Sequence, residues 1–234
     1  MKTIGMIGGM SWESSVEYYR MINEAVREKL GGVHSAKSVM VSVDFAEIET
    51  LQKQGLWREA TRAMLQAAQQ VEAGGADCVL ICANTMHKMA DEVQQGIHIP
   101  LLHIADAAAE AVKAQGLRKL GLLGTRYTME EDFYKLRLAQ KHGLEVLIPN
   151  ADDRAIIHQV IYDELVVGKI NPASKAEYLR IIDTLVNAGA QGIVLGCTEI
   201  GMLVKPGDSQ SPLFDTARIH ALAAVKFALA EEGR

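Results

Sequence analysis

Short apolar runs alternate along the 234-residue chain with longer segments of helical periodicity. This alternation is typical of α/β folds, in which parallel strands are joined by helices that pack on the faces of a sheet. Strands are expected at residues 3–7, 38–43, 78–82, 119–123, 145–148 and 192–195. Helices are expected at residues 12–30, 57–73, 86–95, 105–115, 129–142, 154–167, 173–188 and 217–231. The sequence therefore predicts an α/β protein with mostly parallel sheets flanked by helices.

The chain also contains two similar halves. Residues 5–8 (GMIG) align with 121–124 (GLLG), residues 75–80 with 189–195 after a small shift, and residues 99–102 with 211–214. Three matched blocks in the same order favour an internal duplication, and their period is too long for a solenoid. We therefore expect two similar α/β lobes that face each other across a cleft, with ligands beyond the carboxyl ends of the strands.

Composition excludes several classes of protein. Hydrophobic residues make up 49% and charged residues 23%, as in folded, water-soluble domains. The longest apolar run, residues 78–83, is far below the roughly 18 to 20 residues of a membrane span, and the Gly-rich N-terminus does not resemble a signal peptide. The net charge is -5 with scattered basic residues, which argues against nucleic acid or a membrane surface as partner. We expect a cytoplasmic protein with a small-molecule partner.

The three cysteines are expected to be reduced. None forms a Cys-x-x-Cys pair, so neither a disulfide framework nor a structural zinc site is supported. Cys78 fits core packing. Cys197 directly follows the run 192–196, which places its thiol at a strand end before a turn. Free amides at the start of a following helix would lower the pKa of such a thiol, so Cys197 is a candidate base or nucleophile.

Other groups near the expected strand ends carry weaker signals. The turn at residues 5–9 lacks the G-x-G-x-x-G spacing of dinucleotide sites, so a dinucleotide cofactor is not indicated. No lysine lies in a recognisable Schiff-base motif, so pyridoxal phosphate is not indicated either. His87, His103 and His220 fit hydrogen-bonded structural histidines better than ligand-orienting ones. Thr128 with Glu131 fits a capping box. The hydroxyl groups of Thr125, Tyr127 and Thr128 therefore have two possible roles, capping of a helix and binding of a substrate.

Four motifs resemble the aspartate/glutamate racemase family, and the match spans essentially the whole chain. They are IGMIGGMS at 4–11, NTMH at 84–87, GTRYTM at 124–129 and GCTE at 196–199. The opening motif favours the aspartate racemase branch. The resemblance implies two pseudo-symmetric lobes with the active site in the cleft between them, a reaction without any cofactor or metal, and a homodimer. It also contributes to the expected boundaries: residues 1–100, completed by 213–234, for the first lobe and 101–212 for the second.

The resemblance assigns roles to individual residues. Racemisation at an α-carbon needs a base on one face and an acid on the other, which the family supplies with two strand-end cysteines. Carried over, Cys197 is the second of these catalytic residues. The substrate carboxylates would be held by Asn84, Thr85, Thr125, Thr128 and Thr198. Three further residues lie where the family contacts the substrate or closes a loop over it: Met10, Gln52 and Lys169.

The position of the first catalytic cysteine is occupied by Ala83, which can neither take nor give a proton. Cys82 does not replace it, because successive strand residues point to opposite faces. Two explanations of Ala83 then fit the resemblance. The protein is a one-base racemase of weak or one-sided activity, or the alanine was introduced to trap a substrate. A single-cysteine decarboxylase of the arylmalonate type and an amino-acid-binding protein with impaired catalysis also remain open. We expect a racemase that acts on aspartate or glutamate through Cys197.

Overall fold

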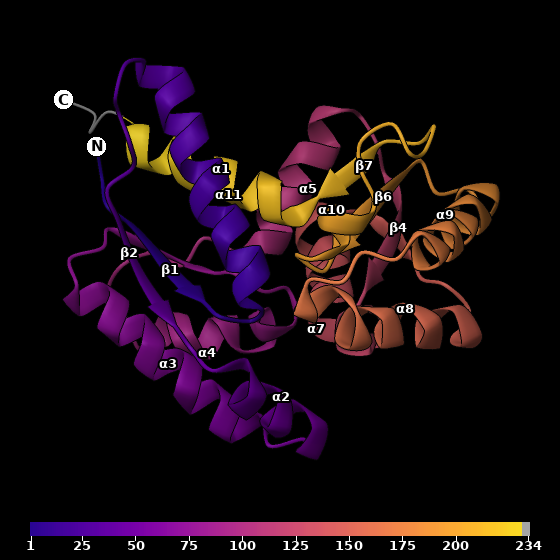
Figure 1. Ribbon diagram of the computed structural model, residues 1–234, viewed down its shortest axis with the longest axis horizontal. Helices are drawn as coiled ribbons and strands as arrows, with labels where there is room; N and C mark the ends of the chain where they lie inside the picture. The colour runs from indigo at the N-terminus through magenta and orange to yellow at the C-terminus, as the bar shows by residue number, and fades with distance from the viewer. Residues whose placement is uncertain (231–234) are drawn as a thin grey trace. The chain divides into compact units, whose positions relative to one another are not determined.

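The computed structural model describes residues 1–230, and the expected helix end at residue 231 lies outside them (Figure 1). The chain divides into two compact units, one of residues 1–103 with the chain from residue 220 onward, and one of residues 104–219. Each unit contains one parallel sheet flanked by helices. The predicted α/β class with two sheet-containing lobes is therefore confirmed.

The sheet of the first unit has three strands in the order β2-β1-β3. Its strands are β1 (Ile4–Gly8), β2 (Ser38–Ser42) and β3 (Cys78–Ile81), and all pair in parallel. Its helices are α1 (Trp12–Leu30), α2 (Phe45–Gln54), α3 (Trp57–Ala73), the 3-10 turn η1 (Thr85–Met89) and α4 (Ala90–Gln95). Helix α11 (Thr216–Leu229) returns to this unit, where the carbonyl of Ala228 accepts a hydrogen bond from the backbone of Lys2.

The sheet of the second unit has four parallel strands in the order β5-β4-β6-β7. These are β4 (Lys119–Gly124), β5 (Glu145–Leu147), β6 (Gly192–Gly196) and β7 (Leu213–Asp215). The helical segments are α5 (Ile104–Ala114), α6 (Arg126–Glu130), α7 (Asp132–Leu136), the π-helical turn η2 (Arg137–Lys141), α8 (Ala151–Asp163), the 3-10 turn η3 (Leu165–Val167), α9 (Pro172–Asn187) and α10 (Ile200–Leu203).

The two sheets repeat the same strand order, as an internal duplication predicts. In the first unit the backbone of Val79 donates to Pro100 at 2.9 Å, and Leu101 bridges to Val79 where a fourth strand would lie. In the second unit Ile193 donates to Pro212 at 2.9 Å, and β7 begins at the next residue. The aligned blocks at 99–102 and 211–214 thus occupy the same place beside equivalent strands.

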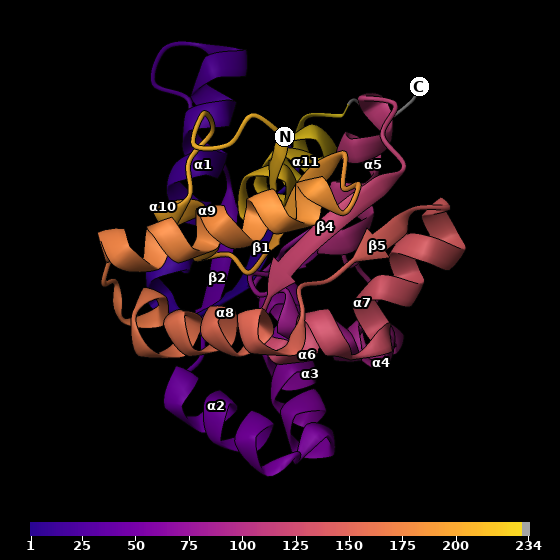
Figure 2. The same ribbon diagram turned by 90° about the vertical axis from the view of Figure 1, so that its right-hand side faces the viewer.

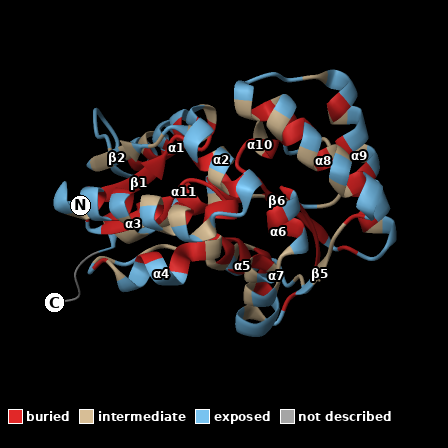
Figure 3. Cartoon of the chain, turned by 90° about the horizontal axis from the view of Figure 1, so that it is seen from below, coloured by how far each residue is buried: buried red, intermediate tan, exposed pale blue. Residues whose placement is uncertain are grey.

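Alternate residues of the second sheet face two different apolar clusters, as the two-residue period of a strand requires. Leu123, Ile193 and Leu195 pack with α8 and α9, which lie side by side over one face (Figure 2). Leu120, Leu122 and Val194 pack with α5 and the segment 134–144 on the other. Burial on both faces explains why β4 and β6 read as continuous apolar runs. All of β6 and all of β4 except Lys119 are buried, and β6 is drawn in the colour of buried residues in Figure 3.

The sequence prediction was wrong at three places. It assigned no element to the residues that form helix α2 and strand β7. The single helix expected at 129–142 begins earlier and is interrupted at Glu131, which has extended dihedral angles. The capping box of Thr128 and Glu131 is also absent: Thr125 caps α6, and its hydroxyl oxygen accepts from the amide of Thr128. The cap lies three residues earlier than expected because β4 ends directly before it.

Candidate active site

The loop that joins β1 to α1 is fixed by close backbone contacts. Gly9 has a φ of 91°, and a Cβ atom there would lie 2.2 Å from the carbonyl oxygen of Val43, so only glycine fits. The amide of Gly9 donates to the hydroxyl of Ser15 at 2.8 Å, and Ser11 caps α1. The short Gly-Gly-Met-Ser motif therefore serves to turn the chain sharply from strand to helix.

The expected residues of the first unit gather at the end of β3. Met10 and Ala83 belong to one apolar cluster, together with Met86. The amide nitrogen of Gln52 lies 3.1 Å from the sulfur of Met86, and Gln52 is itself buried. Asn84 and Thr85 follow Ala83 and are buried as well. The structure thus brings the five expected residues of this unit into one neighbourhood, and Cys82 does not belong to its apolar cluster.

Behind this neighbourhood lies a set of buried histidines. The Nδ1 atom of His87 donates to the carbonyl of Ala83 at 2.8 Å, which holds the turn after β3. The ring of His87 lies 4.5 Å from that of His103 and 5.7 Å from that of His220, between centroids. His220 accepts from the hydroxyl of Tyr18 at Nδ1 and donates from Nε2 to a backbone carbonyl. These contacts favour the structural interpretation of the histidines.

In the second unit, the expected threonines lie beside the end of β6. The hydroxyl oxygens of Thr125 and Thr128 are 3.3 Å apart, and both side chains are buried. Gly124 pairs with Gly196 across β4 and β6. A Cβ atom added to Gly196 would lie 3.4 Å from a methyl group of Thr128, so that threonine packs directly on the residue before Cys197.

Cys197 forms a buried polar pair with Glu199, the last residue of the GCTE motif, to which the family resemblance assigned no role. Its Sγ atom donates to the Oε2 atom of Glu199 at 3.0 Å, and the same oxygen accepts from the hydroxyl of Thr198 at 2.9 Å. Glu199 is only 2% exposed. Its place two residues after the cysteine was visible in the sequence, but the direction of its side chain was not. The arrangement holds one proton between a thiol and a carboxylate.

The expected acidification of Cys197 was wrong. Burial, the negative charge of Glu199 and the hydrogen bond to that carboxylate raise the pKa of the thiol well above its usual value. The backbone amides of Thr198 and Glu199 lower it, but the first three effects prevail. The helix that follows, α10, has only four residues, and its dipole is correspondingly small. Cys197 is therefore a neutral thiol at rest.

The other two cysteines have no such partner arrangement in the described structure. Burial raises the pKa of Cys78 to about 11 and raises that of Cys82 as well. Both are fully buried, as a packing role requires. Lys169, expected to contact the substrate or close a loop, is exposed after η3, and no hydrogen bond or ion pair within residues 1–230 joins its side chain to another expected site residue.

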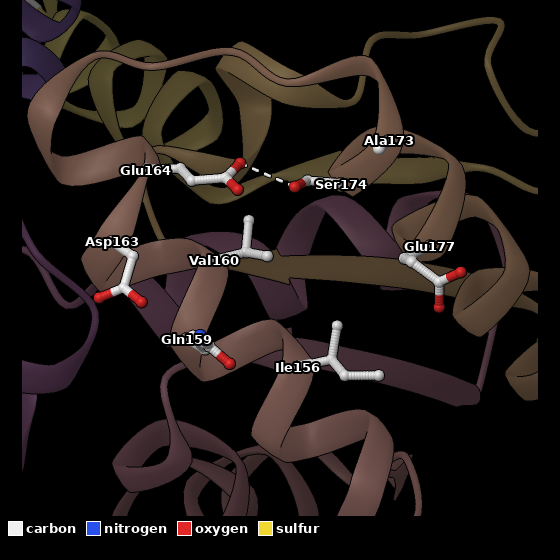
Figure 4. A pocket seen from close by; sticks show the side chains of 8 residues that line it. All are labelled: Ile156, Gln159, Val160, Asp163, Glu164, Ala173, Ser174 and Glu177. Atoms are coloured by element: carbon white, nitrogen blue, oxygen red, sulfur yellow. Dashed lines mark hydrogen bonds between the residues drawn. The ribbon is translucent and has the colours of Figure 1, made fainter.

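A separate hollow in the second unit contains none of the expected site residues (Figure 4). It lies between α8 and α9 and has a volume of about 280 Å³. Glu164 there accepts a 2.7 Å hydrogen bond from Ser174, which joins the two helices. Glu164 is therefore part of the packing between these helices.

Within residues 1–230, no group of three or more His, Cys, Asp or Glu side chains is placed to hold a metal ion. No helix in the same range combines the length and the apolar character that a membrane crossing requires.

Comparison with known proteins places these features in context. The profile of the Asp/Glu/Hydantoin racemase family matches residues 7–224. A Yersinia pestis protein of known crystal structure, assigned as an Asp/Glu racemase, is 51% identical in sequence to this chain. The two structures match with a TM-score of 0.90 over 98% of this chain and 100% of that one. PH1733, an aspartate racemase homologue from Pyrococcus horikoshii OT3, is 35% identical with a TM-score of 0.84, over 98% of this chain and 100% of its own. The broad specificity amino-acid racemase RacX of Bacillus subtilis (strain 168) is 23% identical over 175 residues, which are 74% of each chain.

Proposed function

Because the chain belongs to the Asp/Glu/hydantoin racemase family, we propose that it is an amino-acid racemase in which Cys197 exchanges the α-proton of the substrate. Aspartate and glutamate are the proposed substrates, since the solved relatives of 51% and 35% identity are named as an Asp/Glu racemase and as an aspartate racemase homologue. The observation that carries the proposal is the buried hydrogen bond from the Cys197 thiol to Glu199.

The pair supplies a proton acceptor without a cofactor. When the thiol proton passes to the Glu199 carboxylate, the thiolate takes the α-proton of one enantiomer, and the electron pair of the broken bond delocalises into the α-carboxylate. A proton from water then adds to the other face of the α-carbon, and the pair returns its extra proton to solvent. The charge of the intermediate would be stabilised by hydroxyl and amide donors. For that role we propose Thr125, Thr128 and Thr198 in the second unit and Asn84 and Thr85 in the first, with Met10, Gln52 and Lys169 as further substrate contacts.

Ala83 determines the character of the proposed activity. It stands after β3, where the family carries its other cysteine, and its methyl group offers no proton to the second face. Water must serve there, so we propose weak or one-sided racemisation. The proposal also includes a pyridoxal-phosphate-independent reaction, a cytoplasmic location and a homodimer.

A single-thiol decarboxylase is the second candidate, favoured by the same alanine. In such an enzyme one cysteine protonates one face of an enediolate after loss of carbon dioxide, so no partner at position 83 is needed. An amino-acid-binding protein without turnover is the third.

The deciding experiment is incubation in deuterated water with each enantiomer of aspartate and of glutamate. Loss of the α-proton signal reports proton abstraction, and optical rotation reports inversion. We expect exchange of at least one enantiomer that is abolished by Cys197→Ala and retained by Cys82→Ala, which removes a buried thiol elsewhere. Absence of exchange with all four substrates would sink the proposal, and turnover of an arylmalonate would then favour the decarboxylase.

A further inference from the structure

The carbonyl oxygen of Ala83 is held by a side chain of the turn that follows it. Strand β3 ends at Ile81, and the 3-10 turn η1 begins at Thr85. The Nδ1 atom of His87, on η1, lies 2.8 Å from the carbonyl oxygen of Ala83, and both residues are buried. A carbonyl oxygen can only accept a hydrogen bond, so Nδ1 of the imidazole carries a proton. The contact therefore defines the protonated nitrogen of His87 as well as the direction of the carbonyl.

The equivalent carbonyl of the second unit is held by the main chain. Cys197 directly follows β6, and its carbonyl oxygen accepts from the backbone amide of Ile200 at 3.1 Å. In the first unit the backbone bond of the turn is shifted by one residue, since it runs from the amide of His87 to the carbonyl of Asn84 at 3.0 Å. This shift leaves the Ala83 carbonyl to the imidazole. A backbone bond persists through most side-chain substitutions, whereas the bond to Ala83 depends on the identity of one side chain.

The geometry of the peptide carries the effect of His87 to the candidate site. The Ala83–Asn84 peptide bond is trans, so its N–H group points away from its carbonyl group. Once the carbonyl is turned toward the imidazole, the orientation of the whole peptide plane is set. The Cα atoms of both residues lie in this plane. The bond to His87 therefore also restricts the directions in which the side chains at positions 83 and 84 leave the chain.

The ring of His87 has little freedom to move away from this carbonyl. Its centroid lies 4.5 Å from that of His103 and 5.7 Å from that of His220. His220 is itself anchored, since its Nδ1 atom lies 3.0 Å from the hydroxyl of Tyr18 and its Nε2 atom lies 2.6 Å from the carbonyl of Leu102. All of these residues belong to the first unit, and the three histidines are buried. The packing therefore pre-organises the imidazole for the contact that it makes.

We propose that His87 is a positioning residue of the candidate site. Its bond to the Ala83 carbonyl sets the direction of the Asn84 side chain and of any acid or base placed at position 83. His87 acts on the substrate through this peptide and takes no part in proton transfer. The catalytic consequence rests on the proposed function, in which Asn84 stabilises the intermediate, but the orientation of the peptide does not. The geometry and the reaction are therefore tested separately.

Two substitutions of His87 separate its hydrogen bond from its bulk. His87→Asn places an amide nitrogen where Nδ1 stands, so a donor to the Ala83 carbonyl is kept. His87→Gln carries its amide nitrogen one carbon further from the main chain, as Nε2 is, so its donor no longer matches the position of the carbonyl. The control is His220→Gln, which removes a ring of the same cluster that bonds Tyr18 and Leu102. Urea midpoints report the loss of stability, which both glutamine variants should show.

Exchange of the α-proton of aspartate and glutamate in deuterated water tests the catalytic consequence. We expect His87→Gln to lower kcat about tenfold or more with KM nearly unchanged, because Asn84 is proposed to bind charge that develops only in the transition state. His87→Asn should recover kcat to within about threefold of the native value, and His220→Gln should keep it. In the Ala83→Cys background, His87→Gln should abolish any gain in racemisation and His87→Asn should retain it. Equal losses of kcat in the two glutamine variants, or no recovery with His87→Asn, overturn the proposal.

Nitrogen-15 NMR of the protein without substrate tests the geometry independently of the reaction. The ring signals of His87 are identified by their absence in His87→Asn. We expect a proton on Nδ1 of His87 in the native chain, and an amide signal of Asn84 that shifts more in His87→Gln than in His87→Asn or His220→Gln. A neutral His87 ring with its proton on Nε2, or an Asn84 signal that shifts equally in all three variants, overturns the proposal. If no substrate exchanges, the proposed reaction fails, and these signals still decide the orientation of the Ala83–Asn84 peptide.

Discussion

The Sγ atom of Cys197 donates a 3.0 Å hydrogen bond to the Oε2 atom of Glu199, and both side chains are buried. The carboxylate keeps the thiol neutral because its charge opposes a second negative charge beside it. The Glu199 carboxylate is also the acceptor to which the thiol proton can pass directly. Glu199 therefore has two separable effects, one on the acidity of Cys197 and one on proton transfer.

Glu199→Gln separates these two effects. Removal of the negative charge should lower the pKa of Cys197, so the rate of its alkylation by iodoacetamide should rise at a lower pH than in the native chain. Deuterium exchange at the substrate α-carbon should fall about 100-fold or more, because the amide cannot accept the proton. The matched control is Glu164→Gln, which removes a carboxylate that accepts from Ser174 in the same unit. An unchanged exchange rate would refute a role for Glu199 in proton transfer.

Ala83→Cys should restore the missing acid or base on the second face of the substrate. The residue is 7% exposed and lies in the apolar cluster that contains Met10, so one added sulfur atom is a small change in volume. We expect two-way racemisation to rise at least tenfold, with inversion following exchange closely. Ala83→Ser adds an atom at the same place but a far weaker acid, and should not raise inversion. Equal gains with both variants would mean that position 83 acts by packing instead of by proton transfer.

The parallel strands could be predicted because they are buried on both faces and read as apolar runs. Helix α2 was missed because its sequence is mostly polar and only Ile48 and Gln52 on it are buried. The strand-end position of Cys197 was visible from the run before it. The pKa of its thiol was not, since it depends on burial and on where the Glu199 side chain points, neither of which local sequence determines.

His220 should make stability sensitive to mild acid. Burial lowers its pKa from about 6.5 to about 4, while its ring accepts from Tyr18 and donates to Leu102. Between these values the unfolded chain binds a proton that the folded chain does not, so stability falls as the pH drops. The loss from this group should be about 2 kcal/mol between pH 7 and pH 5. Urea midpoints at both pH values measure it: His220→Gln should reduce the difference by that amount, and His34→Gln, at an exposed position, should not. An equal pH difference in His220→Gln would show that other groups cause it.

Asp106 should stabilise the second unit through an ion cluster. Its carboxylate accepts two hydrogen bonds from Arg137, at 2.7 and 2.8 Å, and also contacts Lys141 and His142, so it fixes α5 to the π-helical turn η2. Its side chain is 21% exposed, which limits screening by water. Asp106→Asn leaves the basic side chains facing one another and should lower the free energy of unfolding by about 2 kcal/mol, measured as a lower urea midpoint. Glu59→Gln removes the carboxylate of an exposed pair with a 2.9 Å contact and should cost less than about 0.5 kcal/mol. If both variants cost the same, the cluster around Asp106 contributes no more than an ordinary surface pair.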